Sequence, residues 1–339
     1  MTQPVRRPSA RVVIVNWRQA ELTIRAARSI REQLGGGDVL VIVDNASGDG
    51  SAERLRREGL TVVESSENRG FGAGVNLGAR GMAEDVLVLL NNDAVAEPGF
   101  LEALLAPLGD PPSAAAPAAT TARILLAGRW KPAAPGQQDA LVSPRTGRWT
   151  RLDEEAAARG EGEVLVNSTG NLVDASGNGY DRDWLVPAGQ EHSPSEVFGL
   201  CGGACAIRRE AWRTLDGFRE DLFMYYEDTD LSWRLRERGW RVLYVREAVA
   251  RHDHASSSGT SSPMFIQVNV RNRILTATAH SPAPVVMQAL ARTLVRSLRG
   301  PQRGPVMTGL AQAVLGLPRE LRRRTRGRAR RSSTSAEHR

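Results

Sequence analysis

A run of carboxylates at residues 227–230 is the feature of this sequence with the clearest capacity for chemistry. Glu227, Asp228 and Asp230 follow the apolar and aromatic stretch FMYY. Like charges this close together, beside an apolar wall, should raise the pKa of at least one carboxyl group, which suits a general base. Asp228 also stands at an expected helix start, where a carboxylate is a good cap. A proton acceptor and a helix-capping cluster are therefore both open interpretations.

A second polar cluster, Asn91-Asn92-Asp93, directly follows the apolar run VLVLL. A carboxylate at a strand end can bind a divalent cation such as Mg²⁺ or Mn²⁺, which would neutralise a diphosphate leaving group. His252 and His254 are two residues apart and face the same side of an extended chain, so either could complete a site with Asp93. A capping turn and structural histidines are the competing interpretations.

Three further segments carry groups that suit a nucleotide. Asp44 ends the run VIVD, where it could accept a hydrogen bond from a uracil or thymine imide or form an ordinary Asx turn. The loop NRGFG at 68–72 allows close backbone approach to a ligand, and Arg69 could meet a phosphate. Arg271 and Arg273 lie near a helix start, where they could bind phosphate or remain solvated.

Short apolar runs alternate with helical stretches through the first hundred residues. The pattern predicts strands at 12–17, 39–45, 60–65 and 85–93, with helices between them. Strands that are apolar throughout predict a parallel sheet covered on both faces, with the ligand at the carboxyl ends of the strands. Those ends carry polar residues, namely Asn16, Asp44, Asn45, Glu64, Asn91, Asn92 and Asp93.

The rest of the chain is less periodic. Residues 107–160 are rich in Pro, Ala and Gly and predict a loosely structured insertion. Residues 284–324 contain two amphipathic helical segments. We expect residues 1–10 to be flexible and the basic tail at 325–339 to be disordered.

Composition and charge exclude several classes of protein. The 339 residues include 41% hydrophobic and 24% charged residues, as in a soluble globular protein, and two cysteines are too few for a disulfide framework. No signal peptide or membrane-spanning run is evident, which predicts a cytoplasmic location. The net charge of +7 comes from residues 292–331, which hold twelve arginines and one acid. A basic tail on a mildly acidic body argues against nucleic acid. It fits either peripheral contact with an anionic membrane or a solvated tail.

The motifs occur in a recognisable order. The sequence resembles the family 2 glycosyltransferases, most closely the bacterial rhamnosyltransferase-like branch. The motifs that carry the resemblance are, in order, VVIVNW, VIVDNASGDGS, NRGFGAGVN, VLLNNDA, GLCGGACAIRREAW, FMYYEDTDLSW and RHDHASS. The resemblance covers roughly residues 10–280. It implies a GT-A fold over residues 11–283: a Rossmann-like α/β domain with a mostly parallel central sheet and helices on both faces.

The resemblance also implies a role for each matching residue. Asp228 would be the base, supported by Glu227, and Asp93 would bind the metal with His252 or His254. The acceptor side would hold Gly202, Gly203, Ala204 and Asp230. The nucleotide sugar would contact Asn16, Asp44, Asn45, Glu64, Asn68, Arg69, Gly70, Asn76, Asn91, Asn92, Arg271 and Arg273. The metal triplet has a single charged member, which predicts weaker metal affinity.

The expected activity is inverting, metal-dependent transfer of a hexose, such as L-rhamnose, from a dTDP- or UDP-linked donor. The acceptor would be a hydroxyl of a glycan, a lipid-linked sugar or a secondary metabolite. The alternative is a catalytically inactive GT-A module that binds a sugar nucleotide or glycan. A nucleotidyltransferase would need a Gly-rich basic loop after the first strand, and VNWRQAELT does not supply one.

Overall fold

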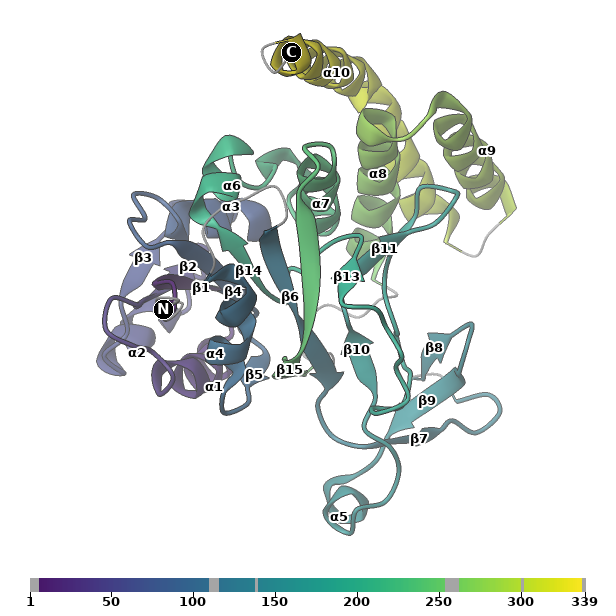
Figure 1. Ribbon diagram of the computed structural model, residues 1–339. Coiled ribbons are helices and arrows are strands. Elements are labelled where there is room, and N and C mark those ends of the chain that lie inside the picture. The colour runs from purple at the N-terminus through teal and green to yellow at the C-terminus, as the bar shows by residue number, and fades with distance from the viewer. Residues whose placement is uncertain (1–5, 110–115, 138–139, 254–261, 300–301, 337–339) are drawn as a thin grey trace.

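The computed structural model describes residues 6–109, 116–137, 140–253, 262–299 and 302–336. Strands and helices alternate through the first ninety residues, as the sequence predicts (Figure 1). They are β1 (Ala10–Asn16), α1 (Ala20–Arg31), β2 (Val39–Asp44), α2 (Ser51–Arg57), β3 (Val62–Glu64), α3 (Phe71–Gly78) and β4 (Val86–Leu90). β1 pairs in parallel with β2 and β4, and β2 with β3, so their carboxyl ends share one edge of the sheet.

Later segments extend this sheet on the β4 side. The added elements are β5 (Ala94–Ala96), β6 (Pro117–Leu126), β10 (Val166–Ser168), β13 (Glu196–Val197), β14 (Ala204–Arg208) and β15 (Arg241–His252). The main strand order is β13-β15-β6-β14-β4-β1-β2-β3, and β14 is antiparallel to both β4 and β6. The antiparallel β14 brings the segment before it, residues 201–203, to the carboxyl end of β4.

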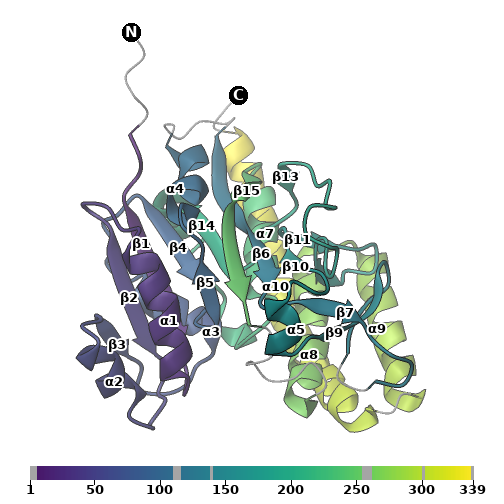
Figure 2. The same cartoon turned by 90° about the horizontal axis from the view of Figure 1, so that it is seen from below.

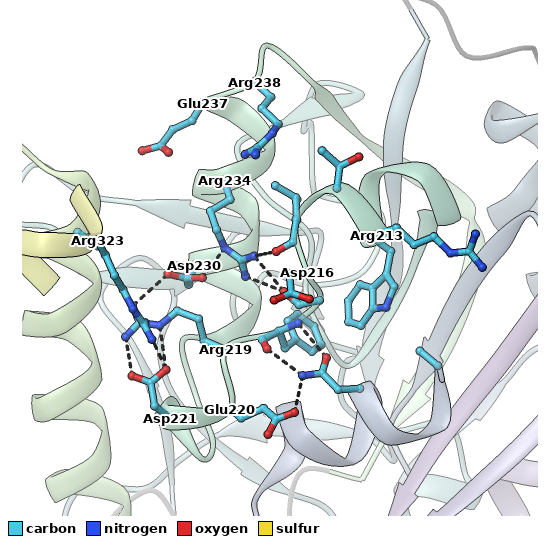
Figure 3. A pocket seen from close by; sticks show the side chains of 18 of the residues that line it. Arg213, Asp216, Arg219, Glu220, Asp221, Asp230, Arg234, Glu237, Arg238 and Arg323 are labelled. Atoms are coloured by element: carbon cyan, nitrogen blue, oxygen red, sulfur yellow. Dashed lines mark hydrogen bonds and ion pairs between the residues drawn. The ribbon is translucent and has the colours of Figure 1, made fainter. Parts of the chain in front are cut away.

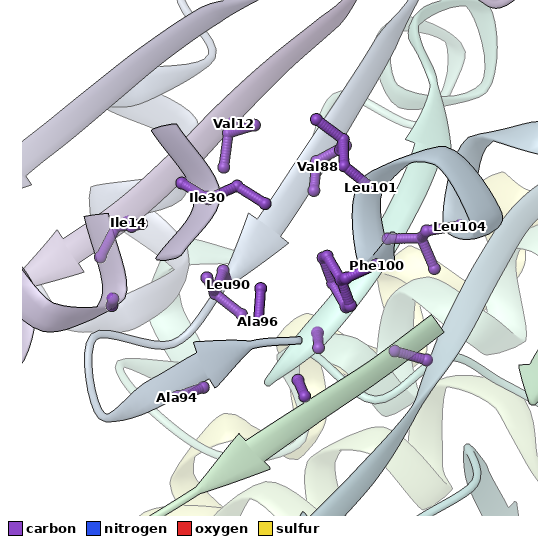
Figure 4. Packing of buried hydrophobic residues seen from close by; sticks show 14 of the residues in the cluster. Val12, Ile14, Ile30, Val88, Leu90, Ala94, Ala96, Phe100, Leu101 and Leu104 are labelled. Atoms are coloured by element: carbon purple, nitrogen blue, oxygen red, sulfur yellow. The ribbon is translucent and has the colours of Figure 1, made fainter. Parts of the chain in front are cut away.

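Apolar side chains pack on both faces of the sheet. All five residues of β4 are buried. On one face Val88 and Leu90 meet Ile30 of α1 and Phe100 of α4 (Phe100–Leu105), as Figure 4 shows. A separate buried cluster covers the other face. Burial on both faces explains why these strands are apolar throughout, and it confirms the mostly parallel α/β sheet.

The predicted loose insertion at 107–160 is wrong for much of its length. After the short 3₁₀ helix η1 (Ala106–Leu108), β6 runs through the middle of the main sheet. Next come β7 (Trp130–Pro132), β8 (Leu141–Ser143), β9 (Gly147–Arg151) and α5 (Glu154–Ala158). β7, β8 and β9 form a small sheet over a core that includes Trp130 and Trp149. The many small residues nearby hide the apolar period of these strands.

The C-terminal part contributes a hairpin and several helices. These are β11 (Asn171–Val173), β12 (Gly179–Asp181), α6 (Arg209–Thr214), η2 (Glu220–Leu222), α7 (Glu227–Arg236), α8 (Pro263–His280), α9 (Ala283–Arg299) and α10 (Arg303–Ala336). α8, α9 and α10 form a layer beside the sheet (Figures 1 and 2).

The backbone of α10 continues to Ala336, through residues that we expected to be disordered, in a segment rich in the good helix formers Arg and Ala. Among the described residues, no helix is both long and apolar enough to cross a bilayer.

Candidate active site

Asp228 is held at the start of α7 by backbone amides. Gly202 N donates to its Oδ2 at 3.0 Å, and Thr229 N donates to its Oδ1 at 2.6 Å. The neighbouring carbonyl of Gly203 accepts from Asn91 N at 2.8 Å. A continuous chain of contacts therefore connects the carboxylate to the first residue of the Asn91-Asn92-Asp93 triplet. The antiparallel pairing of β14 with β4, which sets Ala204 opposite Leu90, fixes this arrangement.

Glu227 is buried beside Asp228. Burial, reinforced by the negative charge of Asp228, raises the pKa of Glu227 to about 8. Its Oε2 is buried and has no hydrogen-bond partner among the described residues. Glu227 is therefore mostly protonated at neutral pH, in keeping with the expectation that crowding beside an apolar wall would raise one of these pKa values.

Asp93 and His252 meet where β4 and β15 end. Asp93 Oδ1 lies 2.9 Å from His252 Nε2, and His252 Nδ1 lies 2.8 Å from Asn167 Oδ1. Burial opposes the charged imidazole, but the hydrogen bond and charge of Asp93 outweigh it and raise the pKa of His252. A carboxylate and an imidazole in contact, with the second ring nitrogen fixed by a neighbour, form a donor pair that suits a divalent cation.

This donor pair is small. Among the described residues, no group of three or more His, Cys, Asp and Glu side chains is gathered so that it could hold a metal. Mg²⁺ and Mn²⁺ sites of nucleotide enzymes commonly take one or two protein ligands and complete their shell with phosphate and water. The residues present therefore fit a cation that binds together with a diphosphate.

Asp44 is fixed at the end of β2. Its Oδ1 accepts from Asn16 Nδ2 at 2.7 Å and from Ser47 Oγ at 2.6 Å, and its Oδ2 accepts from Ser47 N at 3.0 Å. The Asx-type turn that competed with a nucleobase contact is thus present. A carboxylate can accept about four hydrogen bonds, so one more can form. Asp44 and Glu64 also line a hollow of about 550 Å³.

The glycine loop before α3 is anchored to β2. Asn45 Nδ2 donates to Asn68 Oδ1 and to the carbonyl of Gly70, both at 3.0 Å. Phe71 N then donates to the carbonyl of Phe223 at 2.9 Å. Through these bonds the glycine loop contacts the segment that leads into Glu227 and Asp228.

Comparison with known proteins shows the family of this chain. The family described as glycosyltransferase like family 2 matches residues 8–273. The chain belongs to this family. The N-acetylglucosaminyl-diphospho-decaprenol L-rhamnosyltransferase of Mycobacterium tuberculosis (strain ATCC 25618 / H37Rv) is 27% identical over 244 residues, which cover 65% of this chain and 68% of the relative.

Solved structures with the same fold include the glucosyl-3-phosphoglycerate synthase of Mycobacterium tuberculosis in complex with Mn²⁺, UDP-glucose and phosphoglyceric acid. It is 17% identical, covers 81% of this chain and 80% of its own, and superposes with a TM-score of 0.50. The GT-A fold expected from the motifs is confirmed.

The loop before the Glu227-Asp228 pair of this transferase is strained. Phe223, Tyr225 and Tyr226 have positive φ angles of 66°, 64° and 71°, which non-glycine residues rarely adopt. Asn272 of α8 is fully buried, and its Nδ2 lies 2.8–2.9 Å from the carbonyl oxygens of Leu222, Met224 and Tyr225. Asn272 therefore holds the loop that presents the two carboxyl groups. We did not single it out in the sequence, although it lies between Arg271 and Arg273.

Asp181 is a second residue that the sequence analysis missed. It ends β12 opposite Asn171 and accepts hydrogen bonds from Ser168 and Cys201. Burial raises the pKa of Asp181 to about 6; the charge of Asp228 adds to the rise, whereas the hydrogen bonds and His252 oppose it. Asp181 therefore lies within electrostatic range of both Asp228 and His252.

Asp230 does not take the acceptor-side position expected of it. Its carboxylate contacts Arg234 at 2.7 Å and Arg219 at 3.3 Å (Figure 3). It also contacts His280 at 3.0 Å. Burial favours the neutral acid, but Arg234, His280 and Arg219 outweigh it and hold the pKa of Asp230 well below its ordinary value. The spacing explains the correction: two residues along a helix, the side chain points about 200° away from Asp228.

Several expected nucleotide contacts also have other partners. Asn76 bonds to the backbone of Phe218, on both its carbonyl and its amide. Arg273 Nη2 contacts Thr293 of α9 at 2.5 Å, and Arg271 Nη2 contacts the carbonyl of Leu222 at 2.6 Å. These bonds give the three side chains structural partners, and Arg271 contacts the same loop that Asn272 holds.

The remaining predicted contacts lie near the sheet edge or outside the described residues. Arg69 pairs with Glu220 at 2.7 Å, and Glu64 pairs with Arg56. Asn92 Nδ2 donates to Gln19 Oε1 at 3.0 Å. His254 falls outside the described residues, so its assignment stays a prediction.

Proposed function

We propose that this family 2 glycosyltransferase is an inverting enzyme that depends on a divalent cation. The observation that carries the proposal is the position of Asp228. Its Oδ2 is fixed by Gly202 N, one residue before the carbonyl that bonds to Asn91 at the start of the metal triplet. A base held beside a leaving-group site is the arrangement that direct displacement at an anomeric carbon requires.

Asp228 accepts the proton of an acceptor hydroxyl as that oxygen attacks the anomeric carbon. The new glycosidic bond forms on the face opposite the departing nucleoside diphosphate, so the anomeric configuration inverts. Glu227, protonated at neutral pH, adds no second charge beside the base. A bound divalent cation would offset the negative charge on the leaving diphosphate, and Asp93 and His252 would hold it.

The donor and acceptor classes follow from the relative. That protein is named for transfer of L-rhamnose to N-acetylglucosaminyl-diphospho-decaprenol. We assign this chain the transfer of L-rhamnose, from a dTDP-linked donor, to a lipid-linked sugar. Asp44 supports a pyrimidine nucleobase, because its carboxylate has one acceptor position left beside the hollow that it lines with Glu64. Such an acceptor places the enzyme at the cytoplasmic surface of a membrane.

A donor panel tests the activity. Purified full-length protein is mixed with dTDP-, UDP- or GDP-sugars, Mg²⁺ or Mn²⁺, and a short-chain N-acetylglucosaminyl diphospholipid, and nucleotide release is measured. We expect release only with a dTDP-linked sugar, and loss of release with EDTA. Release that is unchanged by EDTA would contradict the metal requirement, and equal use of all donors would contradict the assignment of the sugar.

Asp228→Asn tests the base. Turnover should fall by about 10²–10⁴-fold because Asn cannot take the proton, while nucleotide affinity in a thermal-shift titration stays at the wild-type value. Asp216→Asn, in the turn after α6 and away from the base, is the matched control and should keep wild-type turnover. An Asp228→Asn enzyme with normal turnover would rule out this mechanism.

A further inference from the structure

α9 buries small residues and the half-buried Leu290 against the rest of the protein and exposes four of its large apolar residues. Ala289, Thr293 and Ser297 are buried at four-residue spacing, and Arg273 of α8 bonds to the first two of them. Met287, Leu294 and Leu298 point outward, with 65%, 52% and 60% of their surface exposed. Positions 287, 291, 294 and 298 share one side of a helix, so these side chains form a continuous apolar stripe.

α10 repeats the arrangement. Gly309 and Gly316 contact α8 so closely that an added Cβ would lie 2.4 Å from the Gln267 carbonyl oxygen and 2.7 Å from a Leu275 methyl group, respectively. Ala313, between them, is fully buried. Val306 is also fully buried, and Leu310 and Leu317 pack against α8, whereas Met307, Val314, Leu315 and Leu321 are exposed.

This distribution is unusual for a helix on a water-soluble protein, because large apolar side chains lie on the outer side as well as the inner side. Such a helix buries its large apolar side chains and presents polar ones to solvent. Small residues between helices, with large apolar ones outside, are typical of helices that meet a nonpolar medium. A contiguous exposed apolar surface marks a contact with another molecule or with a membrane.

The charge of the same segment identifies the partner. From Ser281 to Arg319 the sequence contains no Asp or Glu, whereas Arg292, Arg296 and Arg299 of α9 are exposed beside the apolar stripe. The next acid, Glu320, is buried against Arg219. The outer face is therefore apolar and cationic. A second copy of the same face would be repelled by like charge, whereas an anionic lipid surface would neutralise it.

We infer that α9 and α10 form a docking surface for an anionic membrane. The exposed apolar side chains enter the boundary between headgroups and acyl chains, and the arginines remain at the level of the lipid phosphates. The inference deepens the proposed function, on which it rests for the lipid-linked acceptor. It also places the contact on α9 and on α10 as far as Leu321, rather than on the basic residues at 325–339.

Vesicle sedimentation of the full-length protein tests this surface. The vesicles are pure phosphatidylcholine or an equimolar mixture with phosphatidylglycerol. Wild-type protein should sediment with the mixed vesicles, and less so as salt is added. The triple variant Met287→Gln, Leu294→Gln, Leu298→Gln should lose about tenfold or more in affinity, because three side chains no longer leave water. Val142→Gln, an exposed apolar position on β8, is the matched control and should bind as wild type.

The remaining outcomes are also decisive. Wild-type affinity in the triple variant would overturn the inference. A second result would also overturn it: the wild-type protein is a dimer, the triple substitution converts it to a monomer, and vesicle binding does not change. A second copy of the protein would then cover the stripe. Turnover of a short-chain, water-soluble acceptor should be the same in wild type and triple variant. If neither protein shows turnover but the wild type still binds vesicles, the proposed function is contradicted and the inference of a docking surface is not.

Discussion

Gly70 faces the carbonyl group of Phe223 so closely that a Cβ on Gly70 would lie 1.8 Å from the Phe223 oxygen. Gly70 has a φ of 86°, and the following amide, Phe71 N, donates to that same oxygen at 2.9 Å. Two segments that are 150 residues apart in sequence thus meet backbone to backbone. The contact connects the glycine loop at 68–72 to the segment that precedes Asp228.

Replacing this glycine should impair both folding and activity. Gly70→Ala must displace the Phe223 carbonyl and adopt a left-handed backbone, which we expect to cost about 2–4 kcal/mol of stability. Movement of the loop before Asp228 should lower kcat by about 10²-fold. Gly36→Ala is the matched control, because an added Cβ there would contact nothing within 4 Å. Urea unfolding and turnover measure the two effects; a Gly70→Ala enzyme equal to the Gly36→Ala enzyme would contradict the steric argument.

The sequence predicts this fold best where a local pattern decides the structure. Runs such as VLVLL are apolar throughout because both of their faces are buried, and the polar residues after them mark the ligand edge. Asp93 and His252 were predicted together and meet at 2.9 Å. Asp230 was misassigned because two of its partners, Arg219 and His280, lie 11 and 50 residues away. The third, Arg234, is four residues along the same helix and gives a local signal that was not used.

The residues missed by the sequence analysis share one property: their roles depend on tertiary contacts. Asn272 acts on carbonyl groups about 50 residues earlier in the chain. Asp181 reaches the Asp228 region only because β11 and β12 form a hairpin. In both cases the residue type is common and its neighbours in sequence give no reason for choosing it.

Asn272 should be essential for the shape of the loop before the base. Asn272→Asp keeps the size of the side chain but replaces the donor amide with an acceptor, which leaves the Leu222, Met224 and Tyr225 carbonyls without their partner. We expect a loss of about 2–3 kcal/mol in stability and a fall in kcat of at least about tenfold. Asn269→Ala, one turn earlier on α8, removes a bond only to the Phe265 carbonyl of its own helix and should be mild.

The measurements for Asn272 are urea unfolding and the kcat and KM of each variant. A loop that is merely destabilised, with normal geometry once folded, would give normal kcat at low temperature. We therefore expect the fall in kcat to persist under conditions where the variant is fully folded. Equal behaviour of the Asn272→Asp and Asn269→Ala proteins would contradict the role assigned to Asn272.

Asp181 should contribute to binding of a substrate hydroxyl near Asp228. Asp181→Asn retains an acceptor for Ser168 and Cys201 but removes the charge, and we expect kcat/KM to fall by about tenfold, the value of one charge-assisted hydrogen bond. Asp174→Asn is the control on the same hairpin, because Asp174 bonds only within its turn, to Ser176 and Asn178. If the two variants have the same kcat/KM, Asp181 does not contact substrate.

Glu227 should make stability fall as the pH rises. Its pKa is about 8 in the folded protein, against an ordinary value of about 4.5, so the folded state holds a proton that the unfolded state releases. The stability linked to this proton is fully present below about pH 4.5 and is lost progressively up to about pH 8. Glu227→Gln, a neutral mimic of the protonated side chain, should remove that loss and keep most of the activity at pH 7.

Urea unfolding at a series of pH values checks this expectation. The wild-type protein should lose stability relative to Glu227→Gln as the pH rises towards 8, after which the difference should stay constant. Glu210→Gln, an exposed glutamate at the start of α6, should follow the wild-type curve. Parallel curves for the wild-type and Glu227→Gln proteins would mean that Glu227 is already ionised in the folded state. Asp228 would then have a second negative charge beside it at neutral pH.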